Sequence, residues 1–178
     1  MTAKRSVIRP MGRLFTLAAI CALSACARGG AGSAPAQSQS ARVGSTAPTW
    51  SEPSLPGPKL DSSGLRGKAV YLNFFATWCP PCNQEAPAID ALQRSYAARG
   101  LQVVGVDVLE NSGKANDFRS RHHLIYPVVV DTGTLRDEYN VNGLPVHVFI
   151  DRGGIVRKIV VGEISPAEMR TFVERILR

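Results

Sequence analysis

The feature that most constrains the fold of this chain is a pair of cysteines, Cys79 and Cys82, between two strongly patterned segments. Residues 69–76 (AVYLNFFA) are mostly apolar and rich in aromatic and β-branched side chains, which predicts a buried central strand. The next residues that favour burial recur at spacings of three and four, at Cys82, Ala86, Ile89, Leu92 and Tyr96. This spacing predicts an amphipathic helix that ends near Gly100. The cysteines are therefore expected where a central strand turns into a helix.

The rest of the chain alternates strand and helix patterns. We first expect a buried strand at 101–108, a polar helix at 112–121 and a short strand at 126–130. A short helix should follow, from a capped start at Thr134 to about Tyr139. Two strands at 146–150 and 155–161 should then flank a turn at 151–154, and a last helix should begin after Ser165. From residue 69 the order is β-α-β-α-β-α-β-β-α. This order predicts an α/β fold, with a mixed central sheet flanked by helices on both faces.

The N-terminus has the pattern of a targeting segment. Four basic residues within 4–13 precede the uncharged run 14–25, which is too short for a transmembrane helix of ~20 residues. A basic segment before a short apolar core is typical of a secretory signal. Leu23-Ser24-Ala25-Cys26 resembles the bacterial lipobox, which makes Cys26 the expected lipidation site and first mature residue. Two alternatives stay open: a plain signal peptide with Cys26 near the cut by accident, and an uncleaved anchor.

Composition separates this segment from the rest. Residues 27–43 contain almost no large apolar side chain and much Ala, Gly, Ser and Gln, which predicts a flexible tether. We therefore expect a lipoprotein signal peptide at 1–25, a lipidated cysteine and tether at 26–43, and one folded domain at 44–178. The formal net charge is +7, but residues 1–25 hold four of the 21 basic residues and no acid. The remaining basic excess is small, which argues against a nucleic-acid partner.

Cysteines three residues apart at the start of a helix can form a reactive pair. Positions i and i+3 lie ~5–6 Å apart between Cβ atoms, and small adjustments bring them to disulfide distance. The N-terminus of a helix also stabilises a thiolate. We therefore expect Cys79 to be the exposed nucleophile and Cys82, one turn inside, to be more buried and to resolve the mixed disulfide.

A structural disulfide and half of a zinc site are the other interpretations of this pair. A bridge that closes only two intervening residues adds little chain-entropy stabilisation. Zinc takes four ligands, and His122, His123 and His147 lack ligand spacing to one another. We expect no metal site, and no cofactor other than a redox-active cysteine pair.

The segment Gly67-Lys68 followed by YLNFFATWCPPCNQEAP resembles the extracytoplasmic thioredoxin family often called TlpA/ResA/CcmG-like. The resemblance covers residues 44–178, with Phe75 in place of the family's usual Trp and with Pro87 at the position of its helix-kinking proline. It implies a thioredoxin-like fold and a thiol–disulfide oxidoreductase whose redox disulfide joins Cys79 and Cys82. It also implies a reductase of client protein disulfides, for example in cytochrome c maturation, with electrons from a transmembrane thiol donor.

The same resemblance supplies candidate substrate-binding residues. Gly143-Leu144-Pro145 matches the family's cis-proline loop, which packs against the disulfide and exposes a backbone edge to the substrate. The family usually has Thr after this proline, where this chain has Val146-His147. His147 could tune thiolate or substrate charge, but a strand histidine that faces solvent is the favoured interpretation. The expected substrate-binding residues are Trp78, Pro81, Leu144, Pro145 and Val146.

Acid–base assistance for the cysteines needs another group, because Asn73 stands where thioredoxins keep a buried Asp. Glu110, just after the strand 101–108, matches a family glutamate at a strand end and is the expected proton acceptor or modulator of cysteine pKa. Asp107 is its rival, and a solvated loop carboxylate is the plain alternative. We interpret Trp50 as core or edge packing, and the pair at 122–123 as a solvated helix end.

We thus expect a monomeric extracytoplasmic enzyme that is lipid-anchored to a bacterial membrane. Its expected partners are client proteins with disulfides and a transmembrane thiol donor. The main alternative is a metal-binding lipoprotein or metallochaperone that uses Cys79, Cys82 and His147. A non-catalytic scaffold on the same fold is a third hypothesis.

Overall fold

The computed structural model describes residues 40–178, which contain two sheets. Six strands form the main sheet in the spatial order β2-β6-β5-β4-β7-β8. They are β2 (Ser54–Leu55), β6 (Val128–Val130), β5 (Leu101–Asp107), β4 (Ala69–Phe75), β7 (Val146–Ile150) and β8 (Val156–Val161). The central pairs β4–β5 and β5–β6 are parallel, and the other pairs are antiparallel, so the sheet is mixed, as predicted. A second, two-stranded sheet pairs β1 (Ser51–Glu52) with β3 (Leu60–Asp61).

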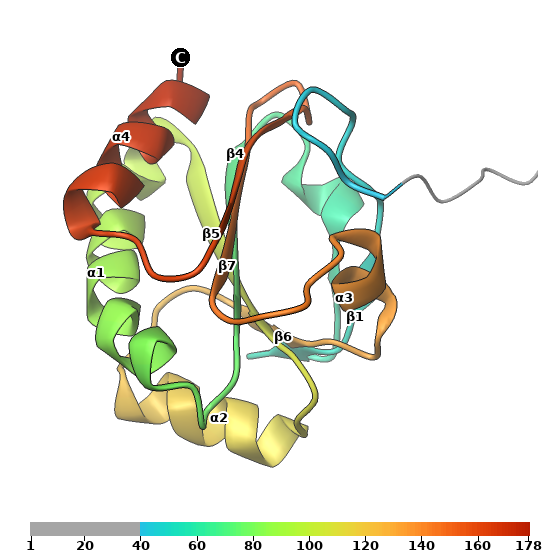
Figure 1. Cartoon of the computed structure of the whole chain (residues 1–178), viewed down its shortest axis with the longest axis vertical. Coiled ribbons are helices and arrows are strands. Elements are labelled where there is room, and N and C mark those ends of the chain that lie inside the picture. Colours follow the sequence, from blue (N-terminus) through green and yellow to red (C-terminus); the bar gives the residue numbers. More distant parts are fainter. Residues whose placement is uncertain (1–39) are drawn as a thin grey trace, which may run out of the picture. The chain divides into compact units, whose positions relative to one another are not determined.

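Helices cover both faces of the main sheet. Figure 1 shows α1 (Pro80–Tyr96) and α4 (Pro166–Ile176) on one side of the sheet and α3 (Thr134–Glu138) on the other. The core is correspondingly split in two. One cluster joins alternate strand residues such as Tyr71, Phe75 and Phe149 to α1, α4 and α2 (Ser112–Arg121). The other joins the intervening residues, such as Leu72 and Val148, to Trp50, Leu135 and Tyr139.

Local signals in the sequence explain where the long helices begin and end. Cys79 is the N-cap of α1 and prolines fill its first turn, where their missing N–H groups cost nothing. A short 3-10 turn (Ala97–Arg99) extends α1 to Gly100, whose φ of 89° is a left-handed conformation that suits glycine. Ser165 and Glu168 form a capping box at the start of α4. The predicted element order from residue 69 onward is confirmed.

Two predicted element starts differ in detail. β6 begins at Val128, because the preceding Pro127 has no N–H to donate to the ladder. The N-cap of α3 is Gly133, and Thr134 is its first residue. The carboxylate of Asp131 caps this helix instead, since it accepts N–H groups from Gly133, Leu135 and Arg136 at 3.0 Å each.

The folded part begins before the predicted boundary at Gly44. Ala41 is buried, and its N–H donates to the carbonyl of Glu138 at 2.7 Å. The three strands before residue 69 were not predicted, because two-residue strands carry no hydrophobic period. The expected signal peptide, the lipidation site Cys26 and most of the tether lie outside the described residues. Within residues 40–178, every helix is too short or too polar to cross a membrane.

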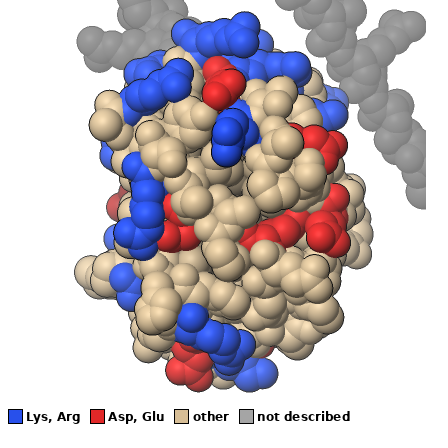
Figure 2. All heavy atoms as spheres, turned by 90° about the vertical axis from the view of Figure 1, so that its left-hand side faces the viewer, with Lys and Arg blue, Asp and Glu red and all other residues tan. Residues whose placement is uncertain are grey.

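Charged groups of both signs share the face formed by α1 and α4. Figure 2 shows Lys and Arg mostly at the top, at the left and near the bottom of this view, with most of the Asp and Glu across the middle. Such a mixed face lacks the single-sign stripe with which proteins track a phosphate backbone. This face therefore gives no support to a nucleic-acid partner.

Candidate active site

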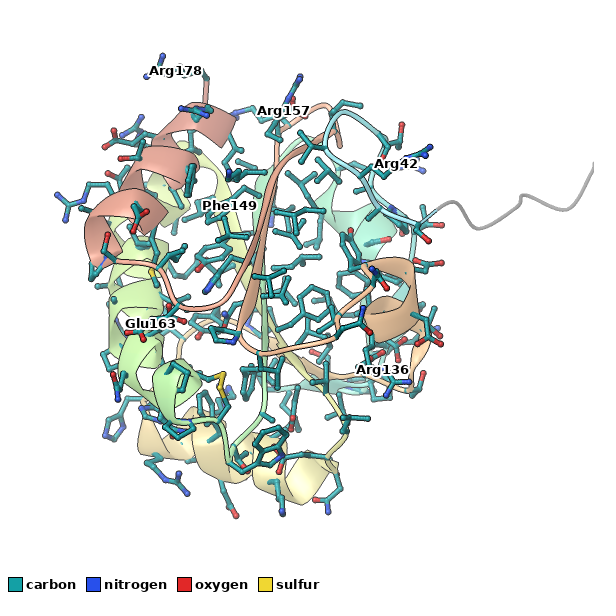
Figure 3. All side chains as sticks on the ribbon, viewed as in Figure 1. Arg42, Arg136, Phe149, Arg157, Glu163 and Arg178 are labelled. Atoms are coloured by element: carbon teal, nitrogen blue, oxygen red, sulfur yellow. A yellow bond between two sulfur atoms is a disulfide. The ribbon has the colours of Figure 1, made fainter. Side chains whose placement is uncertain are left out.

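Cys79 and Cys82 are joined by a disulfide at the N-terminus of α1, with Cα atoms 5.3 Å apart. Figure 3 shows this bond where the chain passes from β4 into the helix. The Sγ of Cys79 accepts the backbone N–H of Cys82 at 3.3 Å. An N–H donor and the positive end of the helix dipole both favour negative charge on that sulfur. After reduction, Cys79 is therefore the sulfur better placed to be a thiolate.

Both cysteines are buried in this oxidised state. Cys79 is 3% exposed and Cys82 is 2% exposed, so the prediction that Cys79 is the exposed member of the pair is wrong for this state. The cause is that the Cys79 sulfur turns inward to bond Cys82 and to accept its N–H. The neighbouring Trp78, in contrast, is 62% exposed and is the most accessible apolar group of the motif.

A groove of about 510 Å³ lies beside the disulfide. Trp78, Cys79 and Pro81 line it on one side, and the segment 140–144, which ends in Leu144, lines it on the other. Three of the five predicted substrate-binding residues, Trp78, Pro81 and Leu144, thus meet at one groove.

The other two predicted substrate-binding residues lie deeper. The Leu144–Pro145 bond is cis, as the resemblance implied, but Pro145 is buried and its carbonyl accepts the N–H of Gly162 at 2.8 Å. Val146 is 1% exposed and packs in the core cluster on the far face of the sheet. Neither residue lines the groove, so a direct substrate contact by either side chain is not supported.

Glu110 is tied to the loop before the disulfide. Its carboxylate accepts hydrogen bonds from the backbone N–H and the hydroxyl of Thr77, the latter at 2.7 Å, and lies 3.4 Å from Nζ of Lys114. Burial raises the pKa of Glu110, but the bonds from Thr77 and Lys114 outweigh it, so the net shift is downward. A lowered pKa and fully used oxygens suit a group that positions the loop. The proton-acceptor role of Glu110 stays a prediction that this geometry does not favour.

His147 is fully buried, so the interpretation as a solvent-facing strand histidine is wrong. β7 is a central strand, and its neighbours Val146 and Val148 point into the cluster beside α3. Alternation therefore turns His147 toward α1, next to Asn73, its register partner on β4. Its Nδ1 lies 2.9 Å from the Tyr71 hydroxyl and 3.4 Å from Nδ2 of Asn73.

Glu85, which sequence reasoning missed, completes this buried polar group. It lies on α1 one turn after Cys82, is 5% exposed, and holds Oε2 at 3.5 Å from Nε2 of His147. Its Oε1 accepts the N–H of Ile164 at 2.7 Å. Burial, and secondarily the charge of Glu163, raise the pKa of Glu85 to about 7 despite that bond. The missed signal was a carboxylate within the apolar stripe that contains Cys82, Ala86 and Ile89.

Asp107, the predicted rival of Glu110, is a second buried carboxyl at the end of β5. It is fully buried and lies near the Glu110 carboxyl. Burial, followed by the charge of Glu110 and by a side-chain hydrogen bond with it, raises the pKa of Asp107 to about 8. Because residues 103 and 107 share a strand face, Asp107 lies on the same side of the sheet as the disulfide.

The remaining candidates lie elsewhere. Trp50 is buried in the core beside α3, which confirms its packing role. His122 is not the solvated helix end predicted for the pair at 122–123: it is half-buried, and its Nε2 lies 3.0 Å from Oδ1 of Asn83.

Residues 40–178 hold no cluster of three His, Cys, Asp or Glu side chains able to bind a metal ion. His147 uses its two ring nitrogens toward Tyr71 and Glu85, so the predicted metal alternative gains no ligand set here.

Comparison with known proteins finds similarity to thioredoxin-like thiol–disulfide oxidoreductases. The model of the AhpC/TSA family matches residues 43–159. The thiol-disulfide oxidoreductase ResA of Bacillus cereus is 31% identical over 142 residues, which cover 79% of this chain and 82% of that protein. ResA of Geobacillus kaustophilus is 36% identical over 135 residues, or 75% and 78% of the two chains. A solved thiol:disulfide interchange protein of the thioredoxin family from Chlorobium tepidum has a TM-score of 0.71 at 34% identity, covering 77% of this chain and 99% of that one.

Proposed function

The chain belongs to the AhpC/TSA family of thioredoxin-like proteins and is a thiol–disulfide oxidoreductase, and we propose that it reduces client protein disulfides outside the cytoplasm while tethered to a membrane. The observation that carries this proposal is the Cys79–Cys82 disulfide at a helix N-terminus, beside a groove lined by Trp78, Pro81 and Leu144. A polypeptide segment can lie in such a groove with its disulfide next to Cys79.

The reaction starts from the reduced protein. The Cys79 thiolate attacks a client disulfide, forms a mixed disulfide and releases one client sulfur, which takes up a proton. Cys82 then loses its proton, and its thiolate attacks the Cys79 sulfur, so that the second client sulfur leaves and is protonated. The client gains two electrons from the cysteines and two protons, one that Cys82 gave up and one from solvent, and the protein ends in the disulfide form that the structure shows.

We assign the proton of Cys82 to the carboxyl of Glu85, which lies one turn further along the same buried helix face. A general base works best when its pKa is near the working pH, and burial raises the pKa of Glu85 to about 7. Glu110 acts differently in this scheme: it fixes Thr77 and thereby the turn that presents Cys79.

The direction and setting of the reaction follow the relatives and the N-terminal sequence. A lipid on Cys26 and the tether after it hold the monomeric domain near a membrane, on its extracytoplasmic side. In that oxidising setting, a reductase has to be re-reduced by a transmembrane thiol donor. Proteins of cytochrome c maturation are the proposed clients.

Trapping tests the mechanism in the native host. A Cys82→Ser variant of the full chain cannot resolve the mixed disulfide, so it should accumulate client adducts through Cys79 that dithiothreitol releases. Cys79→Ser is the matched control and should trap none. Equal trapping by both variants, or by neither, would contradict the assignment of the two cysteines.

Two further measurements test direction and anchoring. A reduction potential as high as about −120 mV, that of a strong oxidant, would overturn the reductase assignment. Cys26→Ala should move the protein from the membrane fraction to the soluble extracytoplasmic fraction. Retention of that variant in the membrane would contradict the lipid anchor.

A further inference from the structure

His147 and Glu85 present two buried polar atoms to one another at a distance longer than a normal hydrogen bond. Nε2 of His147 and Oε2 of Glu85 lie 3.5 Å apart, and both lack a hydrogen bond of normal length. A buried polar group without a partner costs free energy, so such a pair signals a contact that changes with state. Here the state that changes is the protonation of the Glu85 carboxyl.

The other side of the imidazole ring fixes its tautomer. The Asn73 amide nitrogen, 3.4 Å from Nδ1, can only donate, so Nδ1 must accept. The Tyr71 hydroxyl, 2.9 Å from the same nitrogen, then donates to it as well. In a neutral imidazole the proton therefore lies on Nε2, the nitrogen that is 3.5 Å from Oε2 of Glu85.

His147 is neutral under ordinary conditions. Burial lowers the pKa of His147 to about 4, against a weaker upward effect of its contact with the backbone of Gly162. The 3.5 Å contact with Glu85 therefore joins a neutral N–H to the carboxyl and is not an ion pair. A donor of this kind stabilises a carboxylate more than a carboxylic acid.

We propose that His147 is a positioning residue of the thiol–disulfide exchange: it directs its Nε2–H at Glu85 and stabilises the ionised carboxyl that accepts the Cys82 proton. This inference rests on the proton transfer to Glu85 in the proposed function, but not on the direction of the overall reaction. Tyr71 and Asn73 act indirectly, through the histidine: their contacts with Nδ1 keep the proton on Nε2, the nitrogen that faces Glu85.

Other groups around Glu85 act on the same equilibrium. The N–H of Ile164 also stabilises the carboxylate, whereas Glu163, in the loop before α4, opposes it; Figure 3 labels Glu163 beside α1. Tyr71 stays neutral, since burial raises its pKa well above the ordinary value, with smaller upward effects of Glu85 and Tyr126. His147 is thus the donor from the sheet side, and Ile164 the donor from the α4 side.

The test is a pH titration of the Glu85 carboxyl by 13C NMR in the full-length reduced protein, with its resonance assigned by its loss in Glu85→Gln. His147→Asn keeps a polar group near Tyr71 but removes the donor that faces Glu85. It should raise the Glu85 midpoint by about one pH unit. His147→Gln places an amide N–H near the Nε2 position and should restore most of the shift. The pH profile of Cys82 alkylation should move in parallel.

The results distinguish a failure of the His147 inference from a failure of the proposed proton transfer to Glu85. An unchanged Glu85 midpoint in His147→Asn, or equal shifts in the Asn and Gln variants, would overturn the role of His147. If instead Glu85→Gln leaves the Cys82 profile unchanged, the proposed proton transfer itself fails.

A second variant keeps the inference testable if His147→Asn does not fold. Tyr71→Phe retains the ring that stacks on Phe149 with centroids 4.4 Å apart but removes the donor to Nδ1, so it should give a smaller shift in the same direction. Tyr139→Phe, a buried tyrosine of the opposite core cluster, is the matched control and should give none. A Tyr71→Phe protein that titrates like Tyr139→Phe would count against the proposal.

Discussion

The carboxylate of Glu110 accepts both the backbone N–H and the hydroxyl of Thr77, two residues before Cys79. This bidentate contact fastens the end of β5 to the turn that carries the disulfide. It connects two segments that are distant in the sequence, and it fixes the entry of the chain into α1. The contact therefore ties the stability of the fold to the geometry of the redox site.

Glu110→Ala should lower the free energy of unfolding by about 1–3 kcal/mol, because it leaves the half-buried N–H of Thr77 without its acceptor. Urea unfolding of the oxidised protein measures this. Lys114→Met is the control: its Nζ contacts the same carboxylate from an exposed position, so this change should lower the free energy of unfolding by less than about 1 kcal/mol.

If Glu110 positions the loop, Glu110→Gln should leave the shape of the pH–rate profile unchanged. Loss of its basic limb would instead restore the proton-acceptor role.

The stability of the oxidised protein should fall as pH rises from about 4 to about 8. Glu85 and Asp107 have folded pKa values raised to about 7 and about 8, so their contributions are complete below the unfolded values near 4 and are lost as pH rises through 7 and 8. His147 acts in the opposite direction: its pKa is lowered to about 4, so stability falls as pH drops from about 6.5 to 4. Two carboxyls outweigh one imidazole between pH 4 and 6.5, so the net stability falls as pH rises from about 4 to about 8.

Urea unfolding between pH 4 and pH 9 checks this profile. Asp107→Asn removes a carboxyl that must ionise while buried, so it should stabilise the protein at pH 9 by on the order of 2–5 kcal/mol and have much less effect at pH 5. The exposed Asp137→Asn is the control and should change neither value appreciably. A flat stability curve from pH 5 to pH 9 in the parent protein would contradict the buried, protonated state of both carboxyls.

The two tryptophans should separate client binding from folding. Trp78 is 62% exposed at the groove, so Trp78→Ala should weaken client reduction through KM and change the free energy of unfolding by less than about 0.5 kcal/mol. Trp50 is buried beside α3, so Trp50→Ala should cost about 3–5 kcal/mol of stability and spare the kinetics of the fraction that folds. Steady-state kinetics and urea unfolding together distinguish the two. A large loss of stability in Trp78→Ala would mean that this side chain packs against the domain.

Much of this fold could be predicted because its signals are local. The apolar strand before Cys79, the stripe after it and the Ser165–Glu168 box each specify an element without reference to the rest of the chain. β2 could not be predicted in this way. It is two residues long and is defined only by its antiparallel pairing with β6, more than seventy residues later.

The site was only partly predictable, because its polar residues depend on tertiary burial. The spacing of Cys79 and Cys82 is enough to predict a redox pair, whereas the environment of His147 follows from the position of β7 between β4 and β8. A strand that has helices on both faces of its sheet buries the side chains on both sides. The polarity of His147 alone therefore led to the wrong prediction that it faces solvent. Glu85 was overlooked for the related reason that a carboxylate on a helix usually faces water.

Asn83 ties the disulfide turn to the end of α2, and its replacement supplies the last prediction. Its amide nitrogen donates to the carbonyls of Thr77 at 3.0 Å and Cys79 at 2.8 Å, while its oxygen meets Nε2 of His122 at 3.0 Å. Asn83→Asp replaces this donor with a carboxylate, which should repel both carbonyls and disfavour a thiolate on Cys79 nearby.

The expected result is a Cys79 thiol pKa about one unit higher in Asn83→Asp, measured as the pH dependence of iodoacetamide alkylation of the reduced protein. The matched control is Asn111→Asp, the same change at the exposed N-cap of α2, where Asp caps as well as Asn does. Its alkylation profile should equal that of the parent protein. Coincident profiles for the two Asp variants would show that the amide of Asn83 has no part in thiolate stability, and would leave the helix N-terminus and the N–H of Cys82 as the groups that set it.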